Sequence, residues 1–179
     1  MLIRVARILP AAFIVAAISA CGTSAPARFY SLETTAVSAG ARPVRAAVMV
    51  GDVTVPASVD QPQFVVQTAP NRVELEDFNR WDSPLENAIA RAVAGDLTIL
   101  LGTPDVAAAP MADFKADYQV SIQVQRFESI RGQAAALDAV WTVRRVADGK
   151  TRTGRTTARE SVQGQGFEVL AAAHSRALG

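Results

Sequence analysis

The clearest pattern in the sequence is the apolar face of an amphipathic helix at residues 84–101. Apolar side chains recur there at the spacing of one helical face, at positions 85, 88, 89, 92, 93, 97, 100 and 101. Ser83 is placed to cap the first turn, Glu86 completes a capping box, and Pro84 fits the first helical position. Gly102 follows the last apolar residue, as is typical of a helix end.

Strand patterns lie on both sides of this helix. Alternating or valine-rich apolar positions predict strands at residues 28–32, 46–55, 63–68, 72–75, 118–125, 137–143 and 151–162. Ala69-Pro70-Asn71 and Asp148-Gly149 predict hairpin turns, and Phe127 breaks the alternation, which indicates a bulge or a strand end. Residues 103–112 have the composition of a loop, and residues 165–178 predict a second helix. The fold class expected is α/β (α+β), a single domain whose mixed β-sheet of about five to seven strands is packed with two main helices.

Residues 1–20 have the pattern of a signal peptide. Arg4 and Arg7 form a positive region, and residues 8–20 form an apolar run of 13 residues. Such a run suits the apolar core of a signal peptide and is too short to span a bilayer. It closes with Ile18-Ser19-Ala20-Cys21, which resembles the lipobox of bacterial lipoproteins. We therefore expect cleavage before Cys21 and lipid on its thiol; an ordinary secretory signal with a chance cysteine is the alternative.

The residues after the cysteine bear on location and on domain boundaries. Gly22 stands where an Asp commonly retains a lipoprotein in the inner membrane of Gram-negative cells. By that sorting rule we expect an outer-membrane lipoprotein whose domain faces the periplasm. Residues 21–27 are then the lipidated Cys and a short tether of small residues, and residues 28–179 form the domain.

Composition and charge narrow the classes of partner. Residues 21–179 are enough for one domain with a core. Without Arg4 and Arg7 the chain keeps 16 basic against 17 acidic residues, a net charge of −1. This balance gives no electrostatic reason to expect nucleic acid, nor a basic membrane-binding patch.

Catalytic chemistry is sparse in the sequence. His174 is the single histidine and has no neighbour in sequence that would complete a triad or a metal site. We expect it on a helix surface or at an interface. Four acidic residues, Asp60, Glu74, Glu76 and Asp77, are interpreted as solvated charges. No enzyme activity, metal site or cofactor is predicted.

A series of short motifs carries the most information. In chain order they are Phe29-Tyr30-Ser31-Leu32, residues 50–56, Asp60-Gln61-Pro62-Gln63, residues 71–75, residues 80–85, Arg126-Phe127-Glu128 and residues 137–141. In this order and spacing they resemble the PqiC/YmbA family, the auxiliary lipoproteins of ABC-type and MCE-type lipid transport systems. The series covers most of residues 29–160, whereas each motif alone is weakly specific.

The resemblance implies a function and a set of partners. It implies a non-catalytic, outer-membrane-anchored lipoprotein that works with an MCE-domain protein and its inner-membrane transporter components. That system would support envelope integrity and intermembrane lipid transport. Family members usually carry a longer final helix, so the helix that ends at Gly179 is expected to be truncated. A regulator of another envelope machine, such as a cell-wall synthase, is the alternative, and a periplasmic enzyme is a third hypothesis.

A small domain with a densely packed core offers no cavity wide enough to pass a lipid. A transport role therefore predicts docking on a larger conduit or a homo-oligomer of the lipidated protein. Its interface is expected at residues 60–63, at residues 103–112 or on the final helix with His174.

The motif residues are predicted to be structural or to lie at an interface. Trp81 and Trp141 are expected to be core or helix-anchoring aromatics, Pro56 and Pro62 to shape a turn, and Arg80 to pair with Asp82. The full set carried over from the family motifs is Tyr30, Leu32, Pro56, Asp60, Pro62, Gln63, Arg80, Trp81, Pro84, Leu85, Phe127 and Trp141.

The anchor and the folded domain lie in separate segments, which leads to a first prediction. Replacing Cys21 with Ala should release the protein from the membrane fraction and leave the domain folded, because the acyl chains do not contribute to a core that begins at Arg28. Fractionation and circular dichroism measure the two effects. A variant that stays in the membrane fraction after a high-salt wash would contradict the lipoprotein interpretation.

Overall fold

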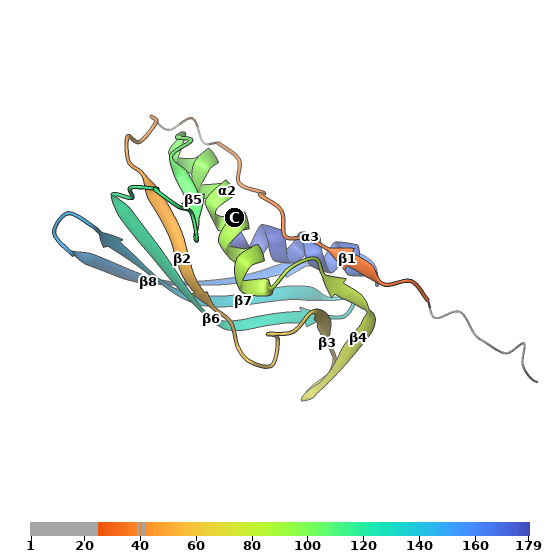
Figure 1. The fold of residues 1–179 in the computed structure, drawn as a ribbon. Helices are drawn as coiled ribbons and strands as arrows, with labels where there is room; N and C mark the ends of the chain where they lie inside the picture. Colours follow the sequence, from red (N-terminus) through yellow and green to blue (C-terminus); the bar gives the residue numbers. More distant parts are fainter. Residues whose placement is uncertain (1–24, 39, 41) are drawn as a thin grey trace, which may run out of the picture.

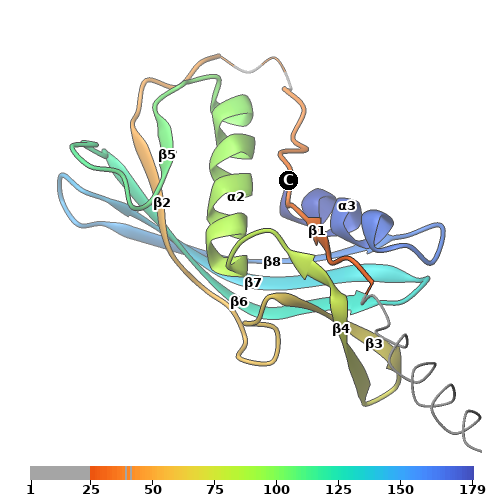
Figure 2. The ribbon, with the colours of Figure 1, turned by 45° about the vertical axis from the view of Figure 1, so that its right-hand side comes forward.

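Two helices cover one face of a mixed β-sheet (Figures 1 and 2). The computed structural model describes residues 25–38, 40 and 42–179. The sheet has eight strands: β1 (Arg28–Tyr30), β2 (Val48–Thr54), β3 (Gln63–Ala69), β4 (Arg72–Trp81), β5 (Val106–Ala108), β6 (Tyr118–Ile130), β7 (Ala134–Arg145) and β8 (Thr151–Ser161). The helices are α2 (Leu85–Leu101) and α3 (Phe167–Leu178).

The long strand β6 organises the sheet. Along one edge it pairs with β7, which pairs in turn with β8, in an antiparallel meander. Along its other edge the first half of β6 pairs with β2, and its last two residues pair with β3, both in parallel. The pairing with β7 shifts register between Val124 and Arg126, which is a bulge of the kind predicted near Phe127. The sheet therefore divides at β6 into a β2–β5 branch and a β3–β4–β1 branch.

The β3–β4 hairpin forms the outer part of the second branch (Figure 2). Its turn follows Pro70 at Asn71, whose φ of 61° lies in the left-handed region that Asn tolerates better than most residues. Beyond the hairpin, β1 pairs in parallel with the last three residues of β4, so that Tyr30 lies opposite Trp81. The start of the domain is thus held against the end of β4.

A cluster of aromatic rings fills the space between the second branch and α3. Phe64 of β3 stacks on Trp81 of β4 with ring centroids 4.0 Å apart, and Trp81 meets Phe127 of β6 edge to face at 5.9 Å. Phe127 stacks in turn on the ring of His174 at 3.8 Å, with an interplanar angle of 8°. Tyr30 and Phe167 extend the cluster from β1 and α3. Short aliphatic side chains fill the rest of the core, as the low aromatic content requires.

The start of α2 differs from the sequence prediction. Pro84 occupies the N-cap position and no side chain caps the helix, so the predicted capping box is wrong. Ser83 is engaged elsewhere, because its hydroxyl donates to Asp82 and accepts from Arg91. At the other end Gly102 adopts φ 61° and terminates α2 as predicted.

The fold class is confirmed: one mixed sheet is packed against two helices. The eight strands exceed the expected range by one, since residues 106–108 form a short strand beside β2 inside the segment predicted as a loop. Strand β4 is also longer than predicted and continues to Trp81. None of the described helices is long and apolar enough to cross a membrane. The predicted signal peptide and Cys21 lie outside the described residues.

The central position of Trp81, which is 5% exposed, leads to a second prediction. Replacing Trp81 with Ala should lower the free energy of unfolding by about 3–5 kcal/mol, because a large ring is lost between Phe64 and Phe127. Urea denaturation measures the change. Trp141→Ala is the matched control with a smaller expected loss, since Trp141 is only half-buried. Equal losses in the two variants would contradict the role of Trp81 in the core.

Candidate functional site

Several of the motif residues meet where β1, the β2–β3 loop and the end of β4 come together. The carbonyl oxygen of Pro62 accepts a hydrogen bond from the Trp81 backbone N–H at 2.8 Å. The carbonyl oxygen of Tyr30 accepts one from Asp82 at 2.9 Å, and Gln63 lies opposite Arg80 in the β3–β4 pairing. Motifs that are far apart in the sequence therefore form one junction.

The β2–β3 loop is shaped by Pro56. Its carbonyl oxygen accepts hydrogen bonds from the backbone N–H groups of Val59 and Asp60, at 2.9 and 3.2 Å, which closes a tight turn. The side-chain amide of Gln61 donates to the carbonyl oxygen of Ser58. This turn leaves Ser58 and Asp60 exposed on the surface of the loop.

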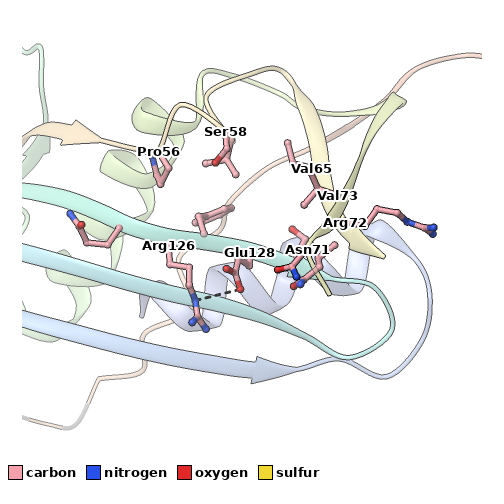
Figure 3. Close-up of a pocket in the computed structure, with 13 residues that line it drawn as sticks. Pro56, Ser58, Val65, Asn71, Arg72, Val73, Arg126 and Glu128 are labelled. Atoms are coloured by element: carbon pink, nitrogen blue, oxygen red, sulfur yellow. Dashed lines mark ion pairs between the residues drawn. The ribbon is translucent and has the colours of Figure 1, made fainter. Parts of the chain in front are cut away.

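A groove of about 320 Å³ lies between this loop, the β3–β4 hairpin and β6. Figure 3 shows its walls: Pro56 and Ser58 come from the loop, Val65 and Val73 from the hairpin, and Arg126 and Glu128 from β6. The guanidinium of Arg126 pairs with the carboxylate of Glu128 at 3.4 Å, and both side chains are exposed to solvent. Phe127 lies between them in sequence and also lines the groove, while its ring packs in the aromatic cluster. The groove combines an apolar side with a charged side and is open to solvent.

The remaining motif residues lie apart from the groove. Leu32 and Leu85 are buried in the core, and Pro84 precedes α2. Trp141 lies on β7 opposite Gly154, where a side chain on residue 154 would collide with the indole ring. Its Nε1 donates to the Thr156 hydroxyl at 3.2 Å. Trp141 therefore packs across the β7–β8 pair and takes no part in the groove.

His174 is completely buried, and the prediction that it lies on a helix surface or at an interface is wrong. Its Nε2 forms a hydrogen bond of 2.8 Å with the hydroxyl of Ser129, which is also buried. Its Nδ1 has no hydrogen-bond partner among the described residues. Burial lowers the pKa of His174 from 6.5 to about 3, so the ring is neutral at physiological pH.

The Ser129–His174 pair places a hydroxyl beside a base, but no described residue forms a hydrogen bond with the Nδ1 atom of His174 to orient the base. The stacking on Phe127 fixes the imidazole instead. The pair is accordingly part of the core packing. Among the described residues no group of three or more His, Cys, Asp or Glu side chains could hold a metal ion.

Two of the predicted charge arrangements differ in the structure. Arg80 donates to the carbonyl oxygen of Asp77 and not to Asp82, so the predicted Arg80–Asp82 pair is wrong. Glu76 is not a free loop charge, because it pairs with Arg131, which lies over the ring of Phe167. Glu74 pairs with Arg72 on the exposed side of the hairpin.

Comparison with known proteins gives one family match. The family model described as "ABC-type transport auxiliary lipoprotein component" matches residues 30–179. No curated protein is significantly similar in sequence to the chain.

Two solved structures show the same fold, and a third is less similar. A crystal structure from Xanthomonas campestris is 22% identical, with a TM-score of 0.70, and the match covers 85% of this chain and 88% of that one. The crystal structure of an uncharacterised protein is 18% identical, with a TM-score of 0.67 and coverage of 86% and 92%. The PelC dodecamer from Paraburkholderia phytofirmans is 14% identical over 87% and 91% of the two chains, and its TM-score of 0.33 is too low to carry an argument.

The buried His174 predicts how stability depends on pH. Between pH 6.5 and about 3 the unfolded chain binds a proton at His174 that the folded chain does not, so stability is lost as the pH falls through this window. At about pH 4.5 the loss relative to neutral pH should be about 2–3 kcal/mol from this residue. Urea denaturation of the wild type and of His174→Phe at both pH values measures it. The variant should lose less stability than the wild type on acidification, and equal losses would contradict the assignment.

Proposed function

Because the chain belongs to the family of ABC-type transport auxiliary lipoprotein components, we propose that it is an outer-membrane-anchored, periplasm-facing auxiliary lipoprotein of an MCE/ABC-type transport system. In this role it supports envelope integrity and intermembrane lipid transport, and it catalyses no reaction. The observation that carries the proposal is the family match over residues 30–179 directly after a lipobox-like sequence ending at Cys21.

The short connection between anchor and domain supports an auxiliary role at a membrane. Residues 22–27 separate Cys21 from the start of β1, so the domain stays close to the bilayer that holds the lipid. The absence of Asp after the cysteine favours the outer membrane. A domain tethered in this way can hold one end of a larger machine at the membrane surface.

The groove between the β2–β3 loop and the hairpin is the docking site that we assign to the partner. It is bounded by motif segments, it is open to solvent, and it offers both apolar and charged contacts. Such a mixture is typical of interfaces between separately folded proteins. The Ser129–His174 pair lies behind the groove, where His174 stacks on Phe127.

The proposed partners are an MCE-domain protein and its inner-membrane transporter components. The described core is filled by side chains, so one copy of the domain has no interior path for a lipid. A conduit made from copies of one chain is a closed ring with a head-to-tail interface. We therefore propose that the lipidated protein either docks on the conduit of its partner or forms a homo-oligomer that continues it.

The groove provides the fourth prediction. Ser58→Trp places a bulky ring in the groove from an exposed loop position, so it should reduce recovery of the MCE-domain partner in affinity purification from cells by about tenfold or more without unfolding the domain. Lys150→Trp is the matched control, because Lys150 is also exposed, in the β7–β8 turn at the far end of the sheet. It should leave partner recovery unchanged.

Three results would contradict the proposal. Recovery of a cell-wall synthase in place of an MCE-domain protein would favour the alternative regulatory role. If both Trp variants are folded by circular dichroism and recover the MCE-domain partner as well as the wild type does, the groove is excluded as the docking site. Equal loss in both variants would mean that binding depends on a different surface.

A further inference from the structure

Three large apolar side chains are exposed next to the tether. Phe29 of β1 is 64% exposed, and Leu75 and Phe78 of β4 are 52% and 47% exposed. Phe29 lies opposite Arg80, two residues after Phe78, so the two phenyl rings share one face of the β1–β4 pair. These three residues are called the apolar strip below. Val73, a fourth exposed residue on the same strand, lines the groove instead.

The length of the tether keeps the apolar strip near the bilayer. Cys21 is seven residues before Arg28, and a fully extended chain of that length spans about 23–25 Å. The outer part of the hairpin, from Arg72 to Asn79, is eight residues long, and its seven residue-to-residue steps span about 24 Å as a strand. The hairpin can therefore reach the surface of the same bilayer that holds the lipid on Cys21.

The charged side chains around the apolar strip are of both signs. Glu74 is paired with Arg72, and Glu76 is paired with Arg131. Arg28 and Arg80 lie next to Phe29 on the paired strands, while the exposed carboxylates of Glu33 and Glu168 line a surface pocket with Phe29. Contact with a bilayer would therefore depend on the apolar side chains rather than on the net charge around them.

The geometry points to a second membrane contact, in which Phe29, Leu75 and Phe78 insert into the boundary between headgroups and acyl chains of the bilayer that holds the anchor. This inference rests on the lipidation of Cys21 in the proposed function. A lipid anchor with a short tether fixes the distance of the domain from the membrane. The apolar strip would fix its orientation as well. The β7–β8 turn lies at the end of the domain opposite β1 (Figure 1), so it would be directed away from the bilayer.

Introduced cysteines can test this contact because Cys21 is the only cysteine and its thiol is consumed by the lipid. We suggest spin labels at Leu75→Cys and, separately, at Phe78→Cys in the full-length lipidated protein, reconstituted in vesicles of phosphatidylethanolamine and phosphatidylglycerol. Lys150→Cys in the β7–β8 turn and Ser58→Cys in the groove are matched controls at exposed positions. Power-saturation measurements compare how often each spin label collides with oxygen, which concentrates in the acyl region, and with a nickel complex that stays in the water.

Two samples are compared: the lipidated protein in vesicles, and the same labelled protein with Cys21→Ala in buffer without detergent. In the vesicles, labels at residues 75 and 78 should lose most of their collisions with the nickel complex and gain collisions with oxygen. Labels at residues 58 and 150 should remain accessible to the nickel complex. Circular dichroism confirms that each variant is folded, and the two independent strip positions guard against an effect of one substitution.

The other outcomes separate the anchor from the apolar strip. Protein that floats with the vesicles while labels at residues 75 and 78 stay as water-accessible as the one at residue 150 would overturn the second contact and leave the anchor intact. Protein without lipid by mass spectrometry, and absent from the floated vesicles, would overturn the anchor and this inference together. A third outcome is broadening of the label spectrum by spin–spin interaction between two copies of the protein, at residue 75 or at residue 78, in detergent as well as in vesicles. It would show that a second copy covers the apolar strip and would overturn the assignment to lipid.

Discussion

The packing of aromatic rings against a neutral histidine is the interaction on which the rest of the domain depends. The series Phe64, Trp81, Phe127 and His174 joins β3, β4, β6 and α3 in an unbroken line of contacts. Because His174 must lose its charge to be buried, this arrangement is favourable only in the uncharged state. Strand β6 forms one wall of the groove, and the same line of rings packs behind this wall. The shape of the candidate site therefore depends on the core.

A buried carboxylate on α2 and a serine on α3 hold the segment that follows β1. Asp96 of α2 is 3% exposed, and its Oδ1 accepts hydrogen bonds from the backbone N–H groups of Thr35 and Ala36, both at 2.8 Å. Ser175 of α3 contacts the same segment, since its hydroxyl accepts from the Glu33 backbone N–H and its carbonyl oxygen accepts from Thr35. A segment without regular structure is therefore held by both helices, and it carries the chain from β1 across the top of the core.

Local patterns predicted the elements that depend on nearby residues. The period of residues 84–101, the turn at Pro70-Asn71 and the turn at Asp148-Gly149 identified α2 and two hairpins. Features that depend on distant partners were not accessible in this way. The burial of His174 is decided by Phe127 and Ser129 on another element, and β5 exists because β2 offers a free edge. Ser83 has the right type and position for a cap but forms hydrogen bonds with Asp82 and Arg91 instead. The groove is formed by three separate segments, so the sequence motifs could indicate its residues but not their arrangement.

The parallel pairing of β1 with β4 has a mechanical consequence. Tension between the envelope and a bound machine would enter the domain through β1, along the axis of the strand. The hydrogen bonds between β1 and β4 lie across the direction of such a force, so they are loaded together in shear. Hydrogen bonds at the end of a hairpin pulled apart would instead break one after another. The chain beyond β1 is then clamped at Glu33, Thr35 and Ala36 by α3 and α2, which adds further bonds in series with the strand. A three-residue strand can thus transmit force to the middle of the domain.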